Sequence, residues 1–308
     1  MTTIRRPDRK IPLVVGIGAA TLDDLVMVPR FCGDEAVIEG AARCRDVGGP
    51  VATALSIIAL HGRTDCQLID GWGDDAACVE ICKALSDCGV GTTGVRTTAG
   101  AVCAHAVILV RQTDGARQII FTPSTAPEPV FEPRMLHGAR LLHMNGRHEN
   151  ACRAAIAAAR VQNVEISFDG GAGRFRESIR DFFEASHLRI VSRDFAEKAS
   201  GSTELAAMAA KLLQPPARLL VITEGVRGSH VWTPDGAHFH QPAFPAEPVI
   251  DTTGCGDVFH GAFLHGWLSE WPLERCAAYA ARLAAKNAEG PGGRHVLKAA
   301  GKTLCLEL

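Results

Sequence analysis

The sequence predicts an α/β protein built on a doubly wound, largely parallel sheet. Short apolar runs rich in Val, Ile and Leu alternate along the chain with longer patterns of helical spacing. The helical patterns are rich in alanine, which lets helices pack closely on a sheet. Two segments, 26–47 and 101–121, break the alternation with hairpin-like patterns. In such folds ligands bind at the carboxyl ends of the strands, so we expect functional residues there.

Each expected strand is short and apolar, and a helical pattern follows it. The strands are 13–17, 66–69, 141–144, 164–168, 188–191 and 219–223. The helices are 51–60, 76–88, 151–160, 175–185, 194–200, 203–213, 257–269 and 273–288. Within 101–121, Gln112-Thr113-Asp114-Gly115 is typical of a turn. Strands inserted into an α/β core often cover a site, so 26–47 and 101–121 predict a lid on one domain spanning 1–308.

Composition narrows the classes of function. The 308 residues carry a formal charge of -2, which gives no electrostatic case for nucleic acid or an anionic membrane. None of the eleven cysteines forms a CxxC pair, so we expect free thiols and a cytoplasmic protein. Arg5-Arg6 and the apolar run 11–20 mimic a signal peptide, but the run is short and meets Asp23-Asp24 at once. We interpret it as a buried first strand.

The stretch Asp251-Thr252-Thr253-Gly254-Cys255-Gly256-Asp257 is the most informative motif. It follows a proline-rich run and leads into a helical pattern, so its glycines lie where a loop becomes a helix. A helix start offers free backbone N–H groups and a positive dipole end, which together bind anions. Asp257 adds a negative charge there, which makes sense if it takes a proton from an incoming hydroxyl. The motif therefore predicts phosphoryl transfer.

Three further motifs accompany it: Gly18-Ala19-Ala20-Thr21-Leu22-Asp23, Gly48-Gly49-Pro50-Val51-Ala52-Thr53-Ala54, and Val221-Ile222-Thr223-Glu224-Gly225-Val226-Arg227-Gly228. In this order and spacing the four resemble the PfkB (ribokinase-like) carbohydrate kinases over essentially the whole chain. The Gly-Cys-Gly-Asp motif is specific for that family, and the others are strong in combination. The resemblance implies a three-layer α/β/α core with a small β lid, and ATP with Mg²⁺ as cosubstrates.

The resemblance also implies roles for individual residues. Asp257 matches the base, and Gly254, Cys255 and Gly256 match the anion hole for the migrating phosphoryl. The sugar-binding set is Asp23, Gly48, Gly49 and the position of Thr53. The ATP-binding set is Thr223, Gly225, Gly228, Thr252 and Asn287. Independently, a carboxylate such as Asp23 can accept strong hydrogen bonds from sugar hydroxyls.

The sequence departs from the family pattern in the sugar-binding motif. Pro50 and Thr53 stand where most members have asparagines, so the usual ribose contacts change. The motif forms and the Pro291-Gly292-Gly293-Arg294 tail are closer to sulfofructose kinases, and the stretch 143–147 resembles ketohexokinase. The sulfofructose branch would give Arg147 a sulfonate to bind, although Asp34 stands near that branch's basic lid residue. We expect a ketose-like sugar, neutral or anionic.

The metal environment and the alternatives stay open. The family's Asn-x-x-Glu is absent near Ser192-Arg193-Asp194-Phe195, which leaves Asp169 as the candidate for Mg²⁺, and a monovalent cation is left open. A silent sugar- or nucleotide-binding regulator is the alternative in another class. A nucleoside kinase would need an aromatic clamp, for which Phe31 and Phe121 are the candidates. A homodimer through the lid is compatible with the family.

Overall fold

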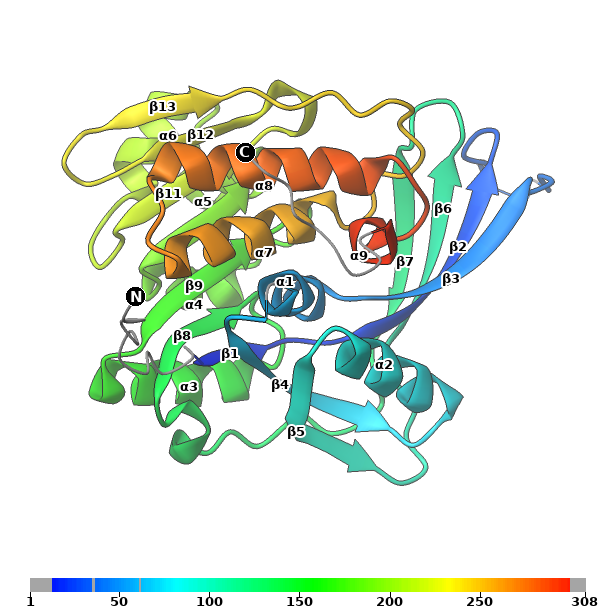
Figure 1. Ribbon diagram of the computed structural model, residues 1–308, viewed down its shortest axis with the longest axis horizontal. Helices are drawn as coiled ribbons and strands as arrows, with labels where there is room; N and C mark the ends of the chain where they lie inside the picture. The colour runs from blue at the N-terminus through cyan, green and yellow to red at the C-terminus, as the bar shows by residue number, and fades with distance from the viewer. Residues whose placement is uncertain (1–12, 35–36, 61, 300–308) are drawn as a thin grey trace, which may run out of the picture.

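The computed structural model describes residues 13–34, 37–60 and 62–299. In this part of the chain a twisted sheet of nine strands lies between two layers of helices, with the order β13-β12-β11-β10-β9-β8-β1-β4-β5 (Figure 1). The parallel strands are β1 (Leu13–Ile17), β4 (Asp65–Gly73), β5 (Val90–Thr98), β8 (Ala139–Met144), β9 (Glu165–Gly170), β10 (Leu188–Ser192) and β11 (Leu219–Thr223). Strands β12 (Ser229–Trp232) and β13 (His238–Gln241) add an antiparallel edge. The predicted ribokinase-like α/β architecture is confirmed.

The helices form two apolar cores, one on each face of the sheet. One core contains α1 (Pro50–Ala59), α2 (Ala76–Asp87), α7 (Cys255–Leu268) and α8 (Leu273–Ala288). The other contains α3 (Glu149–Gln162), α4 (Arg180–Glu184), α5 (Arg193–Ser200) and α6 (Leu205–Leu212). The short α9 (His295–Ala299) follows the loop after α8. Because α1 and α7 pack against each other, the two glycine motifs that precede them meet at one end of the sheet.

A separate four-stranded sheet forms the lid, at the right of Figure 1. It is ordered β3-β2-β6-β7 and contains β2 (Thr21–Val28), β3 (Ala42–Gly48), β6 (His105–Arg111) and β7 (Arg117–Thr122). The predicted turn at 112–115 joins β6 to β7. The first lid segment begins earlier than predicted, because the chain leaves the core directly after β1. Asp23 therefore lies within lid strand β2, opposite Asp46 of β3, and not at the end of the first core strand.

The strands missed by the sequence prediction lie at or near the edges of the large sheet. β5 alternates Thr, Gly and Arg with few apolar residues, and its side chains are mostly half-exposed. β12 and β13 are rich in histidine. Edge strands bury only part of their surface, so their composition carries a weaker apolar signal than central strands do.

The predicted first strand is present, but the basic residues before it lie outside the described part of the chain. Arg5 and Arg6 lie outside the described residues, whereas the apolar run after them does form β1, with Val14 and Ile17 fully buried. Among the described helices, none is long and apolar enough to cross a bilayer. All ten cysteines in the described part are free thiols.

Candidate active site

Residues 251–257, here called the transfer loop, lead into helix α7. Gly254 precedes the helix with φ 70°, and a Cβ there would lie 2.1 Å from the Gly293 carbonyl oxygen, so only glycine fits. The next glycine, Gly256, is exposed, and a Cβ there would meet nothing within 4 Å. The start of α7 is therefore open at Gly256, where an anion can approach the free backbone N–H groups of the first helical turn.

Two buried polar side chains hold the transfer loop from behind. The Asp251 carboxylate accepts hydrogen bonds from the N–H groups of Thr253 (2.8 Å) and Gly292 (2.9 Å). The Asn287 amide donates to the Thr253 carbonyl (3.0 Å) and accepts from Val296 N–H (3.1 Å). Both residues are fully buried. Asn287 was predicted to bind ATP, and in the structure its amide forms these hydrogen bonds inside the protein, where it shapes the loop.

Asp257 lies in the first turn of α7 and is partly buried. Burial raises its pKa, and the positive charge of Arg174 is the strongest opposing influence. A carboxylate with a raised pKa is better matched to accepting a proton near neutral pH. In the same motif, burial raises the pKa of the Cys255 thiol to about 11, so it stays neutral.

Two arginines near the transfer loop were missed in the sequence. The Arg117 guanidinium, on lid strand β7, donates to the Thr252 hydroxyl at 3.1 Å. The Arg174 side chain folds over Gly171 after strand β9, and its Nη1 is buried with no hydrogen-bond partner in the described part of the chain. No signal in the sequence could distinguish these two among the many arginines, because only the fold brings their segments to the loop.

Thr252 connects the transfer loop to the lid. Its hydroxyl donates to the Gly115 carbonyl at 2.8 Å, and its backbone N–H contacts the same oxygen at 3.0 Å. Gly115 belongs to the β6–β7 turn and has φ 66°. Thr252 was expected to bind ATP, but in this structure its hydroxyl is engaged by the lid.

Asp23 and the two glycines before α1 lie close together. Asp23 is 5% exposed, and its carboxylate accepts a hydrogen bond of 2.6 Å from the Thr21 hydroxyl. Burial raises its pKa to about 7. A Cβ at Gly48 would lie 2.0 Å from the Asp23 carboxylate, and one at Gly49 would lie 2.1 Å from the Ala19 carbonyl. The Gly-Gly motif is therefore required by close approach to β2 and to the loop before it.

The other predicted sugar-binding residues lie on α1 and after β8. Thr53 is 1% exposed, one turn into α1. Arg147 is half-buried, and its guanidinium lies 4.6 Å from the centre of the Phe121 ring on lid strand β7. Arg147, together with Phe121 and Ala19, borders a cavity of about 310 Å³. Burial, Arg176 and Arg174, in that order, lower the pKa of Arg147.

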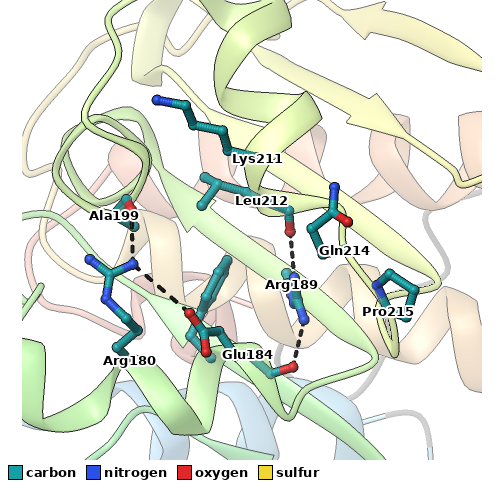
Figure 2. A pocket seen from close by; sticks show the side chains of 9 residues that line it. Arg180, Glu184, Arg189, Ala199, Lys211, Leu212, Gln214 and Pro215 are labelled. Carbon is teal, nitrogen blue, oxygen red and sulfur yellow. Dashed lines mark hydrogen bonds and ion pairs between the residues drawn. The ribbon is translucent and has the colours of Figure 1, made fainter.

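A second cavity, of about 300 Å³, lies at the opposite end of the strands, where β10 begins (Figure 2). Its basic residues are already satisfied by backbone carbonyls. Arg189 donates to Leu212 and Glu184 oxygens, Arg180 to Ala199, and Lys211 to Ser200. This cluster therefore joins loops and helix ends, and it is separate from the transfer loop.

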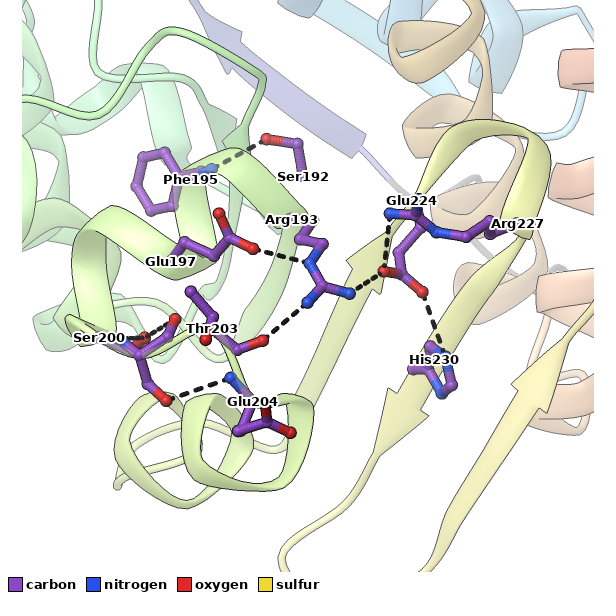
Figure 3. A network of polar contacts seen from close by, with 11 residues as sticks. Ser192, Arg193, Phe195, Glu197, Ser200, Thr203, Glu204, Glu224, Arg227 and His230 are labelled. Atoms are coloured by element: carbon purple, nitrogen blue, oxygen red, sulfur yellow. Dashed lines mark hydrogen bonds and ion pairs between the residues drawn. The ribbon is translucent and has the colours of Figure 1, made fainter.

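The predicted ATP-binding glycines follow strand β11. Gly225 has φ 60° and Gly228 has φ 90°, and a Cβ at Gly228 would lie 2.1 Å from the Gln241 carbonyl. Just before Gly225, the Glu224 carboxylate contacts Arg193 (2.5 Å), Arg227 and His230 (Figure 3). The Thr223 hydroxyl donates to the Val191 carbonyl at 3.4 Å.

The described residues hold no group of three or more acidic, histidine or cysteine side chains that could bind a metal ion. Where the family has Asn-x-x-Glu, Arg193 is instead paired with Glu224 and Glu197. Asp169 is 1% exposed and lies 3.5 Å from His260 Nε2. Its surroundings do not match the open, oxygen-rich shell that Mg²⁺ prefers, so the structure gives no support to Asp169 as a Mg²⁺ ligand.

Residues 12–300 match the model of a family described as pfkB family carbohydrate kinase. The chain is 29% identical over 291 residues to an ATP-dependent ribose-1-phosphate kinase from Halopiger xanaduensis, covering 91% of this chain and 93% of that protein. It is 29% identical over 279 residues to fructokinase-1 of Zea mays, covering 82% of each.

Solved structures share the fold. An Arabidopsis thaliana ribokinase complexed with ribose and ATP superimposes with a TM-score of 0.75 at 23% identity, covering 95% of this chain and 99% of that chain. A Cryptococcus neoformans ribokinase complexed with ADP gives a TM-score of 0.78 at 21% identity, covering 92% and 96%.

Proposed function

Because this chain belongs to the pfkB family of carbohydrate kinases, we propose that it transfers the γ-phosphoryl of ATP to a hydroxyl, by expectation a primary one, of a ketose-like or related sugar. The observation that carries this proposal is the transfer loop. A raised-pKa carboxylate, Asp257, lies within the first turn of a helix whose start is open at Gly256. That arrangement combines a base for the hydroxyl with an anion hole for the phosphoryl.

In the proposed reaction, Asp257 accepts the proton of the attacking hydroxyl as the oxygen–phosphorus bond forms and ADP leaves. The N–H groups at Gly254, Cys255 and Gly256 stabilise the negative charge on the migrating phosphoryl. Arg117 and Arg174 add positive charge from the lid and from the β9 end.

For ATP we propose the glycine turn at Thr223, Gly225 and Gly228, with the transfer loop holding the phosphates. The described residues form no cluster of side chains that could hold Mg²⁺ by itself. A Mg²⁺ ion that arrives with ATP would be held mainly by phosphate oxygens and water, as is usual for this ion. The dependence of activity on a monovalent cation is tested by varying K⁺ in the assay described below.

For the acceptor we propose Asp23, the Gly48-Gly49 turn, Thr53 and Arg147. The names of the relatives include both a neutral sugar, fructose, and a phosphorylated one, ribose 1-phosphate. Arg147 forms no ion pair with a carboxylate among the described residues and borders the cavity beneath the lid. It therefore favours an acceptor with an anionic group, such as a sugar phosphate or sulfofructose.

The test is an ADP-release assay with ATP·Mg²⁺ and a panel of ketoses, pentoses, sugar phosphates, sulfofructose and nucleosides, with and without K⁺. Turnover with a sugar supports the proposal, and turnover with nucleosides alone points to a nucleoside kinase. Tight binding of sugar or ATP without turnover of any acceptor would identify a silent regulator and overturn the enzyme assignment. Thermal shifts with a non-hydrolysable ATP analogue measure that binding separately.

We also propose that the lid forms a homodimer contact in the cytoplasm. Strand β7 is an edge of the lid sheet, and Ile119 and Ile120 are 47% and 58% exposed on it. An exposed apolar edge strand is a ready site for pairing with another copy. Light scattering on the wild type and on Ile120→Lys tests this, since an unchanged dimer or a monomeric wild type would contradict it.

A further inference from the structure

His260, one turn after Asp257 on α7, has hydrogen-bond acceptors at both ring nitrogens. Nδ1 lies 2.7 Å from the Gly256 carbonyl oxygen, and Nε2 lies 2.8 Å from the Ile190 carbonyl oxygen of β10. A neutral imidazole carries one N–H and can satisfy only one of these acceptors. The other contact would then place a nitrogen lone pair against a carbonyl oxygen. His260 is 3% exposed, so water cannot relieve that repulsion.

Asp169, at the end of β9, is a buried carboxylate that lacks hydrogen-bond donors among the described residues, whereas His260 faces one acceptor too many for a neutral ring. Asp169 is 1% exposed, and neither carboxylate oxygen has a hydrogen-bond partner in the described part of the chain. A buried carboxylate without a cation or donors is costly. One cationic partner lies within ion-pair distance in this part of the structure, the Nε2 of His260 at 3.5 Å.

The charged and titratable groups around this pair come from several elements. His143 of β8 is fully buried, with its ring 6.4 Å from that of His260, and burial lowers its pKa to about 4, so it is neutral. Asp257 lies on the same helix as His260, while Arg174 follows β9 and Arg117 comes from the lid. Through His260, the second turn of α7 therefore lies against the three central strands β8, β9 and β10.

We propose that His260 is held as an imidazolium, paired with the Asp169 carboxylate, directly beneath the transfer loop. Each N–H donates to one carbonyl, and the carboxylate balances the ring's charge. The pair joins the second turn of α7 to β9 and β10, and it places the imidazolium behind Gly256 with the Asp169 carboxylate beside it. His260 and Asp169 are thus positioning residues, which act through Asp257 and the anion hole and do not touch the substrate.

The catalytic part of this inference rests on the proposed kinase function, whereas the charge state does not. The pair carries one charge of each sign, and the Asp169 carboxylate raises the pKa of Asp257 more than the His260 imidazolium lowers it. Loss of the pair should therefore lower the pKa of Asp257 and shift the pH–rate profile to lower pH.

Nitrogen NMR of the histidine-labelled wild type tests the charge state without any assay. At pH 8, well above the ordinary histidine pKa of about 6.5, we expect one of the twelve histidines to keep both ring nitrogens protonated. The signal should vanish in His260→Gln. Twelve neutral rings at pH 8 would overturn the proposal even if no variant folds.

Asp169→Asn tests the pairing and its catalytic effect. We expect the His260 signal to become neutral and kcat to fall on the order of 10- to 100-fold, since small misplacements of reacting groups cost this much. The KM for ATP should stay within about twofold, and the pH profile should shift to lower pH. A matched control is His265→Gln, which changes another buried histidine of α7 that is 4% exposed.

A double variant separates pairing from simple loss of packing. Asp169→Asn with His260→Gln removes both charges, so it should be less destabilised than the sum of the single variants. Additive losses would contradict the pair. If the wild type phosphorylates no acceptor but the protonated ring is observed, the kinase function fails while the charge pair stands.

Discussion

The transfer loop and the acceptor side of the site are built in different ways. The loop owes its shape to backbone geometry, because Gly254 lies against Gly293, and buried Asp251 holds two N–H groups. The acceptor side depends on side chains that extend beneath the lid, above all Asp23 and Arg147. A backbone-built centre allows few substitutions, whereas a side-chain-built one can change ligand with one residue. The type of reaction can therefore be predicted from the sequence, whereas the substrate cannot.

The strongest challenge to this contrast is Asp257→Asn. It removes the base without changing the size of the side chain, so we expect kcat to fall on the order of 10²- to 10⁴-fold. ATP binding, measured by calorimetry, should remain near that of the wild type. Retained turnover would rule out Asp257 as the base.

Gly254→Ala tests whether the loop depends on its backbone. The new Cβ would lie 2.1 Å from a backbone carbonyl at a positive φ, so the helix start must shift. Displaced oxyanion donors cost on the order of 10²- to 10³-fold in kcat. The control is Gly256→Ala, where the Cβ meets nothing within 4 Å, and its thermal stability should match the wild type. Equal stability of the two variants would count against the backbone argument.

Asp23→Asn separates stability from sugar binding on the acceptor side. The folded-state pKa of Asp23 is raised from 3.8 to about 7, so the folded protein keeps a proton that the unfolded chain has lost in this window. The free energy of unfolding therefore falls as pH rises from 3.8 to about 7.

Asparagine does not ionise, so the free energy of unfolding of Asp23→Asn should not fall between pH 3.8 and about 7. At pH 8 the variant should be more stable than the wild type by on the order of 2 kcal/mol, while the KM for sugar rises. Urea unfolding at pH 5 and pH 8 measures the difference. Parallel pH dependence in both proteins would show that Asp23 ionises normally.

Arg147→Ala should have the smallest effect and should depend on the acceptor. We expect an increase in KM on the order of tenfold for an anionic sugar, because a charged hydrogen bond contributes about 1.5–3 kcal/mol, and little change for a neutral one. Arg134→Ala, with a side chain 80% exposed, is the matched control. An unchanged KM for every acceptor would place Arg147 outside the site.

Much of the core could be predicted from the sequence because central strands and their helices carry strong periodic signals. β11 was predicted with the bounds it has, and α7 and α8 within two residues. The transfer loop was predicted because Gly254 and Asp257 lie only three positions apart along the chain, and each residue type has a physical requirement there.

The site residues and the lid boundary that were not predicted depend on contacts between segments that are distant in the sequence. Arg117 and Arg174 come from the lid and from the β9 end, and Asn287 reaches Thr253, which is far from it in the sequence. The start of the lid at Thr21 was missed because only three residues, 18–20, separate β2 from β1.

The contact between Gly115 and Thr252 also has a bearing on protein engineering. Hairpin tips usually tolerate insertions and exchange between homologues, but here one residue more or less would move the Gly115 carbonyl away from the loop. If the lid were replaced with that of a relative, segment 249–252 would therefore have to be replaced with the relative's corresponding segment as well.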